Sequence, residues 1–252
     1  MDFAFYQVVV DVLIPDVLSS NMSGALTLQI RNFAKSLEIQ LKKAMQGAPD
    51  VIQKKKLFAV RTLAQTLRRY TSLNHLASAA RGVLQKPDQI QQMFQDFNRV
   101  DIANKQKSLE QWAEWMEAVV DQVLAKYHDK PYNVLADVSK QFLKNWSFYS
   151  SMIIRDLTLR SAQSFGSFHL IRLLFDEYLL YLVELRLAKA SNKPVISVMT
   201  QQGKKKSGKT YGSSGSFYCV FKRSTKVWAV AARASRNSLN SVREQKNLFK
   251  NC

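Results

Sequence analysis

Apolar residues recur at three- and four-residue steps along most of this chain, as far as about residue 190, and this spacing is typical of amphipathic helices. Glycine and proline fall between the periodic segments, where they mark helix boundaries. We therefore expect an all-α fold, a multi-helix bundle. The first expected helix ends near Pro15, and the others span residues 25–46, 49–70, 71–85, 87–97, 108–127, 133–161 and 165–190.

Local signals support several of these boundaries and divide the chain into regions. Ser108 followed by Gln111 fits a capping box, and Pro131 interrupts the helical pattern. The last two helices are long and closely spaced, so we expect them to form a C-terminal helical hairpin. From Lys193 the periodicity stops, and four glycines fall among lysines and serines, as in a flexible tail. The resulting regions are 1–130, 131–192 and a disordered basic tail, 193–252.

The last expected helix is apolar on two sides. A domain core explains the broader side, which carries Ile171, Leu174, Phe175, Tyr178, Tyr181, Leu182 and Leu185. A second stripe has the spacing of a seam between helices and consists of Leu173, Leu180, Val183 and Leu187. A surface helix needs only one apolar side, so this stripe is expected to pack either on another part of the chain or on a second subunit.

The net charge of +18 favours a polyanionic partner such as nucleic acid. Residues 193–252 hold 13 basic residues against 1 acidic residue, and residues 1–192 hold 24 against 18. The third helix also has a basic side that would contact phosphates or an acidic partner, and its members are Lys54, Arg61, Arg68 and Arg69. A solvated surface, or pairing with acidic residues of the same chain, is the commoner explanation of such a side.

The tail contains a run, Gly203 to Thr210, that satisfies the GxxxxGK[ST] pattern of a P-loop and follows a strand-like segment, Val195–Met199. A working P-loop needs a parallel sheet before it and a helix after it, and neither is expected here. We therefore interpret the run as a lysine-rich linker. The same lysines fit a nuclear-import cluster or a plain solvated segment, and they are Lys204, Lys205, Lys206 and Lys209.

Catalytic and ligand-binding patterns are lacking, so we expect no enzyme, no cofactor, no metal site and no small-molecule substrate. The three histidines are far apart, and His169 has the apolar neighbours of a core residue. Both cysteines lie in the tail, at positions 219 and 252, which indicates a reducing compartment and no disulfide framework. No run of 18 apolar residues predicts a membrane-spanning helix, and acidic residues near the N-terminus argue against a signal peptide.

Long stretches of the chain resemble the regulatory factor X family of winged-helix transcription factors. Residues 146–188 are similar to the dimerisation region of that family and read WSFYSSMIIRDLTLRSAQSFGSFHLIRLLFDEYLLYLVELRLA. Four other strings resemble the same family: VVVDVLIPDVL (8–18), IRNFAKSLE (30–38), AQTLRRYTSLNHLASAARGVLQ (64–85) and FNRVDIAN (97–104). The resemblance covers roughly residues 5–199. Residues 105–108 join two segments between which the family usually has a further helical stretch.

The resemblance implies a nuclear regulator of RNA polymerase II transcription that acts at X-box promoter DNA as a homodimer or as a heterodimer with other family members. Residues 1–130 would then be a helical regulatory region, and residues 131–192 the dimerisation region. The winged-helix domain that binds DNA in this family has no counterpart among these residues, so none of its contacts can be transferred. The alternative is a basic protein that binds nucleic acid non-specifically through its tail.

Overall fold

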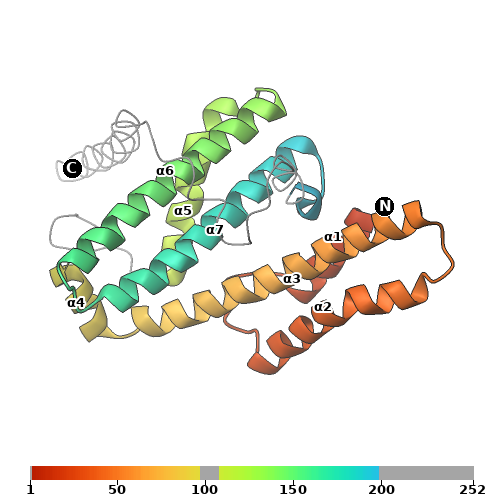
Figure 1. Cartoon of the computed structure of the whole chain (residues 1–252). Coiled ribbons are helices and arrows are strands. Elements are labelled where there is room, and N and C mark those ends of the chain that lie inside the picture. The colour runs from red at the N-terminus through yellow and green to blue at the C-terminus, as the bar shows by residue number, and fades with distance from the viewer. Residues whose placement is uncertain (1, 97–107, 199–252) are drawn as a thin grey trace, which may run out of the picture. The chain divides into compact units, whose positions relative to one another are not determined.

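The computed structural model describes residues 2–96 and 108–198, all of which lie within the first of two compact units, residues 1–205. The secondary structure of the described residues is entirely helical, which confirms the expected all-α fold. The elements are α1 (Asp2–Leu13), α2 (Gly24–Ala44), α3 (Asp50–Leu84), α4 (Pro87–Asp96), α5 (Leu109–Leu124), the 3₁₀-helix η1 (Ala125–Tyr127), α6 (Tyr132–Leu159) and α7 (Phe165–Ser191) (Figure 1).

Side chains and backbone turns at the helix ends explain most of these boundaries. The predicted capping box begins α5, where Ser108 and Gln111 exchange hydrogen bonds with each other's backbone N–H groups. Ser23 caps α2 by accepting from the Leu26 N–H at 3.1 Å. At the other end of the fold, α7 stops at Asn192, which adopts a left-handed conformation with φ of 49°.

Helix α3 corrects one prediction. The sequence indicated two helices that meet at residues 70 and 71, whereas α3 is a single helix of 35 residues. Thr71 and Ser72 are the first two residues of the second predicted helix. In the structure their hydroxyls donate back to carbonyls of the preceding turn, Thr71 to Leu67 and Ser72 to Arg68, and the backbone continues without interruption.

The helices form a layered bundle around one apolar core. Helices α6 and α7 lie side by side as the expected hairpin, α5 packs against both, and α3 runs along α7 and pairs with α2 (Figure 1). Helix α1 lies against α3, where Phe3 and Phe58 meet edge to face with ring centroids 6.4 Å apart. The core draws on nearly every element, with fully buried members such as Val10, Leu67, Val120, Leu135 and Val183.

The helical body continues into the region expected to be tail. Residues 195–198 are helical and not strand-like, and Ile196 and Val198 are fully buried. The Ile196 N–H donates to the Gln7 side chain of α1 at 3.1 Å. The tail predicted to begin at residue 193 therefore contributes its first residues to the core, and its remainder from residue 199 lies outside the described residues.

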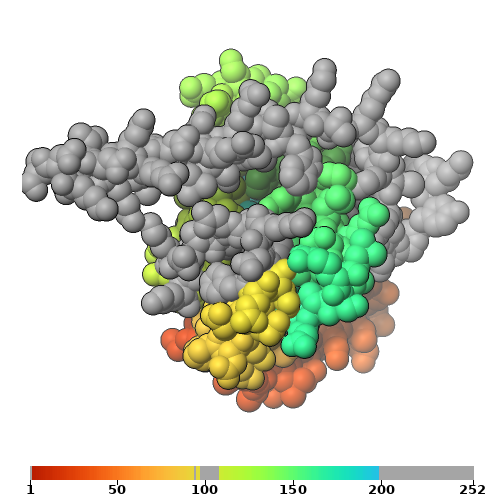
Figure 2. All heavy atoms as spheres, turned by 90° about the vertical axis from the view of Figure 1, so that its left-hand side faces the viewer, coloured from red at the N-terminus to blue at the C-terminus, as the bar shows by residue number. Residues whose placement is uncertain are grey.

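The short helix α4 lies beside the connection between α6 and α7, and Figure 2 shows their surfaces in contact. The Asp96 carboxylate at the end of α4 accepts from the backbone N–H of Ser164 at 2.9 Å and from its hydroxyl. These bonds hold the pKa of Asp96 below its ordinary value. They fix the point at which the chain enters α7.

Candidate functional site

Helix α7 is the element to which the sequence assigned dimerisation, and polar side chains hold it on two neighbours. On the α6 side, the Trp146 indole donates to Asp176 at 2.7 Å, and Arg172 donates to Ser150 at 3.2 Å. On the α5 side, the Tyr178 hydroxyl donates to Glu117 at 2.9 Å. These bonds stand at the rims of apolar contacts, so they fix the rotation of α7 about its own axis.

Burial changes the pKa values of two of these groups. Burial raises the pKa of Asp176, although the Trp146 hydrogen bond and the nearby Arg172 charge act in the opposite direction. Burial and the Glu117 hydrogen bond raise the pKa of Tyr178. The polar groups of α7 are therefore part of the fold and not a set of free catalytic acids or bases.

A buried ion pair joins α7 to the middle of α3. The Arg69 guanidinium lies 2.7 Å from the Glu184 carboxylate, and the side chains of these residues are 19% and 4% exposed. Arg69 also reaches Glu177 at 3.2 Å. Burial raises the pKa of Glu184, and the Arg69 charge works against that rise. Edge-to-face packing of Tyr70 on Tyr181, at 5.3 Å, continues this contact between the two helices.

The second apolar stripe of α7 is only partly free. Leu173 is 40% exposed and Leu180 is half-buried, but Val183 and Leu187 are 0% and 2% exposed within the single chain. The prediction that all four lie at a dimer interface is therefore wrong for Val183 and Leu187, because neighbouring parts of the same chain already cover them. Only Leu173 and Leu180 keep apolar surface that a second chain can bury.

The hairpin also carries a group of exposed apolar residues outside this stripe, near the connection between α6 and α7. Met152 and Leu159 near the end of α6 are 41% and 74% exposed, and Phe165 at the start of α7 is 36% exposed. A shallow depression beside them is lined by Leu157, Thr158, Ser161, Ala162 and Phe165. Together with Leu173 we call Met152, Leu159 and Phe165 the hairpin-end surface. Sequence reasoning missed it because helical periodicity does not tell which end of a helix remains uncovered.

The predicted basic side of α3 is divided by the structure. Lys54, Arg61 and Arg68 are exposed, and Arg61 pairs with Glu38 of α2 at 2.6 Å. Arg69 points away from these three residues, into the contact with α7, so its inclusion in the basic side is wrong. Consecutive residues of a helix project about 100° apart, which explains why Arg68 and Arg69 separate.

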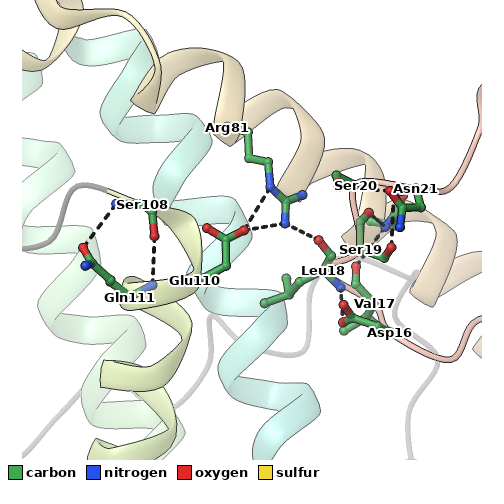
Figure 3. Close-up of polar contacts among 11 residues, drawn as sticks. Asp16, Val17, Leu18, Ser19, Ser20, Asn21, Arg81, Ser108, Glu110 and Gln111 are labelled. Atoms are coloured by element: carbon green, nitrogen blue, oxygen red, sulfur yellow. Dashed lines mark hydrogen bonds and ion pairs between the residues drawn. The ribbon is translucent and has the colours of Figure 1, made fainter.

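A second polar centre, which the sequence did not indicate, fixes the segment between α1 and α2 on α3. The Arg81 guanidinium donates to the Leu18 carbonyl and pairs with Glu110 of α5 at 2.9 Å (Figure 3). About two turns earlier on α3, the buried Asn74 amide donates to the Val17 and Ser19 carbonyls at 3.2 and 2.7 Å. An asparagine within an apolar side of a long helix was the signal available for this contact.

The remaining sequence-predicted residues do not assemble a site. His169 is exposed and stacks on Phe165 at 5.8 Å, which corrects its expected place in the core. Within residues 2–96 and 108–198 there is no group of three or more potential metal ligands, and no helix there is long and apolar enough to cross a membrane. The P-loop-like run and the nuclear-import cluster of Lys204, Lys205, Lys206 and Lys209 lie outside the described residues.

Comparison with known proteins identifies the family. The sequence model of the RFX BCD domain matches residues 1–108 and 102–190, two segments that meet where the resemblance placed a missing helical stretch. The chain is 51% identical to the RFX-like transcription factor daf-19 of Caenorhabditis elegans over 229 residues, 79% of this chain and 28% of that protein. It is 53% identical to Transcription factor RFX3 of Danio rerio, over 79% of this chain and 29% of the relative.

Human Transcription factor RFX3 is 50% identical over 80% of this chain and 30% of its own length. The chain thus spans less than a third of these relatives. No solved structure matches it significantly. The family match covers almost all described residues, including the α3 contacts and the complete hairpin. This chain therefore belongs to the regulatory factor X family of transcription factors.

Proposed function

We propose that this chain is the dimerisation and regulatory region of an RFX-type transcription factor. It would pair with itself or with other members of the family and thereby act on RNA polymerase II transcription at X-box DNA bound by a winged-helix domain not present among these residues. The observation that carries the proposal is the match of the RFX BCD domain to residues 1–108 and 102–190. The relatives are transcription factors, which supports a nuclear role without enzymatic activity.

The hairpin-end surface is the part of the hairpin that we propose for pairing. Leu159 and Phe165 flank one connection, and Met152 and Leu173 lie about two turns from it on α6 and α7, whereas single exposed apolar residues are normal on protein surfaces. In a symmetric dimer each chain contributes the same surface, so each interface residue is buried in both chains. Leu180 adds half-buried apolar area on α7 and extends the surface from Leu173 along the helix.

The test compares aspartate substitutions at exposed apolar positions and includes a control that matches Leu159 in accessibility. Leu159→Asp and Leu173→Asp place a charge in the proposed interface and are expected to raise the dimer dissociation constant at least a hundredfold, because two carboxylates per dimer lose water. Val12→Asp on α1 is the matched control, since Val12 is 73% exposed and Leu159 is 74% exposed. The association state is measured by light scattering over a range of concentrations, and circular dichroism checks folding.

The outcomes separate the alternatives. Loss of pairing in the two hairpin variants, with normal pairing in Val12→Asp, is the expected result. An unchanged dimer in Leu159→Asp and Leu173→Asp would place the interface elsewhere. A wild-type chain that is monomeric at micromolar concentration would contradict self-pairing, and absence of binding to a second family member as well would contradict a dimerisation region.

Nuclear import is proposed to depend on the tail lysines. A fluorescent fusion of the chain is expected to collect in the nucleus, and replacement of Lys204, Lys205 and Lys206 by alanine should distribute it through the cell. Unchanged nuclear accumulation in this variant would assign import to other residues or to a partner.

A further inference from the structure

The net positive charge of the described part of the chain is concentrated in one pair of helices. Residues 24–84, which form α2 and α3, hold 11 basic and 2 acidic residues. The other described residues hold 11 basic and 15 acidic residues. A charge separation of this size on one rigid hairpin creates a positive potential over its surface, and that potential attracts polyanions from a distance.

Three of the basic residues form a straight row along α3. Lys54, Arg61 and Arg68 are exposed and follow one another at intervals of seven residues. Seven residues make almost two turns, so the three side chains point in nearly the same direction and stand about 10 Å apart. The row therefore covers about 21 Å of a continuous helix. One exposed aromatic residue, Phe58 at 38%, lies between the first two basic residues.

Helix α2 adds a second basic row beside the first. Arg31 donates to the hydroxyls of Thr71 and Ser72 at 3.2 and 3.3 Å, and Glu38 pairs with Arg61, so this side of α2 borders the row on α3. Lys35 lies four residues after Arg31, and Lys42 lies eleven residues after it, so both project from the same side of the helix as Arg31. We call Arg31, Lys35, Lys42, Lys54, Arg61 and Arg68 the basic face.

The basic face is not neutralised by the described residues around it. Glu38 is the carboxylate within it, and it pairs with both Arg61 and Lys42. Lys35, Lys54 and Arg68 have no ion pair with any residue in 2–96 or 108–198. Glu38 is only 33% exposed at its side chain and lies close to two cations, which hold its pKa below the ordinary value. Most of the positive charge thus remains available to an external anion.

We propose that the basic face binds the phosphate backbone of duplex DNA without reading its sequence. A straight, evenly spaced row of cations on a rigid helix suits a polymer with regularly spaced phosphates, and guanidinium groups bind phosphates bidentately. An acidic protein segment is the alternative partner for such a face, and the experiment below distinguishes it from DNA. The proposal rests on the proposed function, which brings the chain next to DNA.

The experiment measures binding of the full chain to a 20-base-pair duplex without an X-box, by fluorescence anisotropy over a series of salt concentrations. The variant combines Lys54→Gln, Arg61→Gln and Arg68→Gln. The control combines Lys126→Gln, Lys130→Gln and Lys144→Gln, which removes the same charge at three exposed positions outside α2 and α3. If each of the three basic-face residues contacts a phosphate, the slope of log K against log salt becomes less steep by about 2.7 in the variant and stays near the wild-type slope in the control.

Each outcome decides the proposal. A wild-type slope in the basic-face variant, or an equal change in the control, overturns it, because binding would then follow the tail or the net charge. A basic-face variant that keeps DNA binding but loses the wild-type chain's binding of a poly-glutamate peptide also overturns the proposal, because the face would then bind an acidic protein partner. Light scattering on the same variant should show unchanged pairing, so failure of this proposal is distinguishable from failure of the proposed dimerisation.

Discussion

Replacing Arg69 by leucine is expected to lower the free energy of unfolding by about 3–5 kcal/mol at pH 7, because it leaves the Glu184 carboxylate buried without its cation. Arg69 contacts both oxygens of Glu184 through one nitrogen, at 3.0 and 2.7 Å, and the Glu184 side chain is 4% exposed. Glu177 is 43% exposed and keeps its water, so its share of the loss is small. The cost therefore comes almost entirely from Glu184.

The double variant Arg69→Leu and Glu184→Leu removes both charges and should recover most of the lost stability. Urea unfolding followed by circular dichroism gives the free energies for the wild type, both single variants and the double variant. A double variant as unstable as Arg69→Leu alone would mean that the packing of Arg69, and not the stranded carboxylate, causes the loss.

The pH dependence of Arg69→Leu supplies an independent check. Burial already raises the pKa of Glu184, and loss of the opposing Arg69 charge raises it further. A carboxyl with a higher pKa in the folded state binds its proton more tightly there than in the unfolded state. The loss in free energy of unfolding caused by the ionised carboxylate is therefore present at high pH, and it disappears as the pH falls through the raised pKa. The stability gap between variant and wild type should thus be largest at neutral pH and narrow toward pH 4.5. A constant gap across this range would refute the reasoning.

Three further substitutions or deletions test the α1–α2 segment, the end of the helical body and the P-loop-like run. Asn74→Ala should lower stability by roughly 1–3 kcal/mol, because two carbonyls at the start of the α1–α2 segment lose their donor; an unchanged urea midpoint would contradict this. Deletion of residues 200–252 should leave helical circular dichroism and cooperative melting intact, whereas deletion from residue 193 also removes the buried Ile196 and Val198 and should lower the melting temperature. Lys209→Ala should change neither stability nor nucleotide binding. If the chain bound ATP in a saturable, magnesium-dependent way and this substitution abolished the binding, the run would be a working P-loop.

Helical periodicity predicted the elements well because it reports local chemistry. The capping box at Ser108 needs only the residues within one turn, and it is present as expected. The two errors in the element boundaries have different origins. At Thr71 the hydroxyl bonds within the helix instead of capping a new one, and at Ile196 burial depends on α1, which is 189 residues away along the chain at Gln7. The Thr71 contact lies within four residues, but a threonine can either cap a helix or bond within one. The contact of Ile196 with Gln7 is not visible in any short window of sequence.

The candidate interface was harder to predict, because an apolar stripe shows what must be covered and not what covers it. Val183 and Leu187 have the spacing of a dimer seam, yet the fold of the same chain buries them. Glu184, next to Val183 in the sequence, is a charged residue that the fold also buries, and Arg69 neutralises it there. The hairpin-end surface emerges only when the neighbours of α6 and α7 are placed, since its residues do not share one helical stripe.

Two consecutive arginines on α3 show how one helix can serve both proposed functions. Arg69 turns inward and fixes α7, the second helix of the hairpin that carries the proposed pairing surface. Arg68, about 100° around the helix, turns outward and extends the basic face. Pairing and DNA contact are then separable by substitution at the surface, because the hairpin-end residues and the basic-face residues lie on different helices. Substitution of Arg69 is different, since it loosens the contact that fixes α7 against α3 and should therefore disturb pairing even though Arg69 touches no second chain.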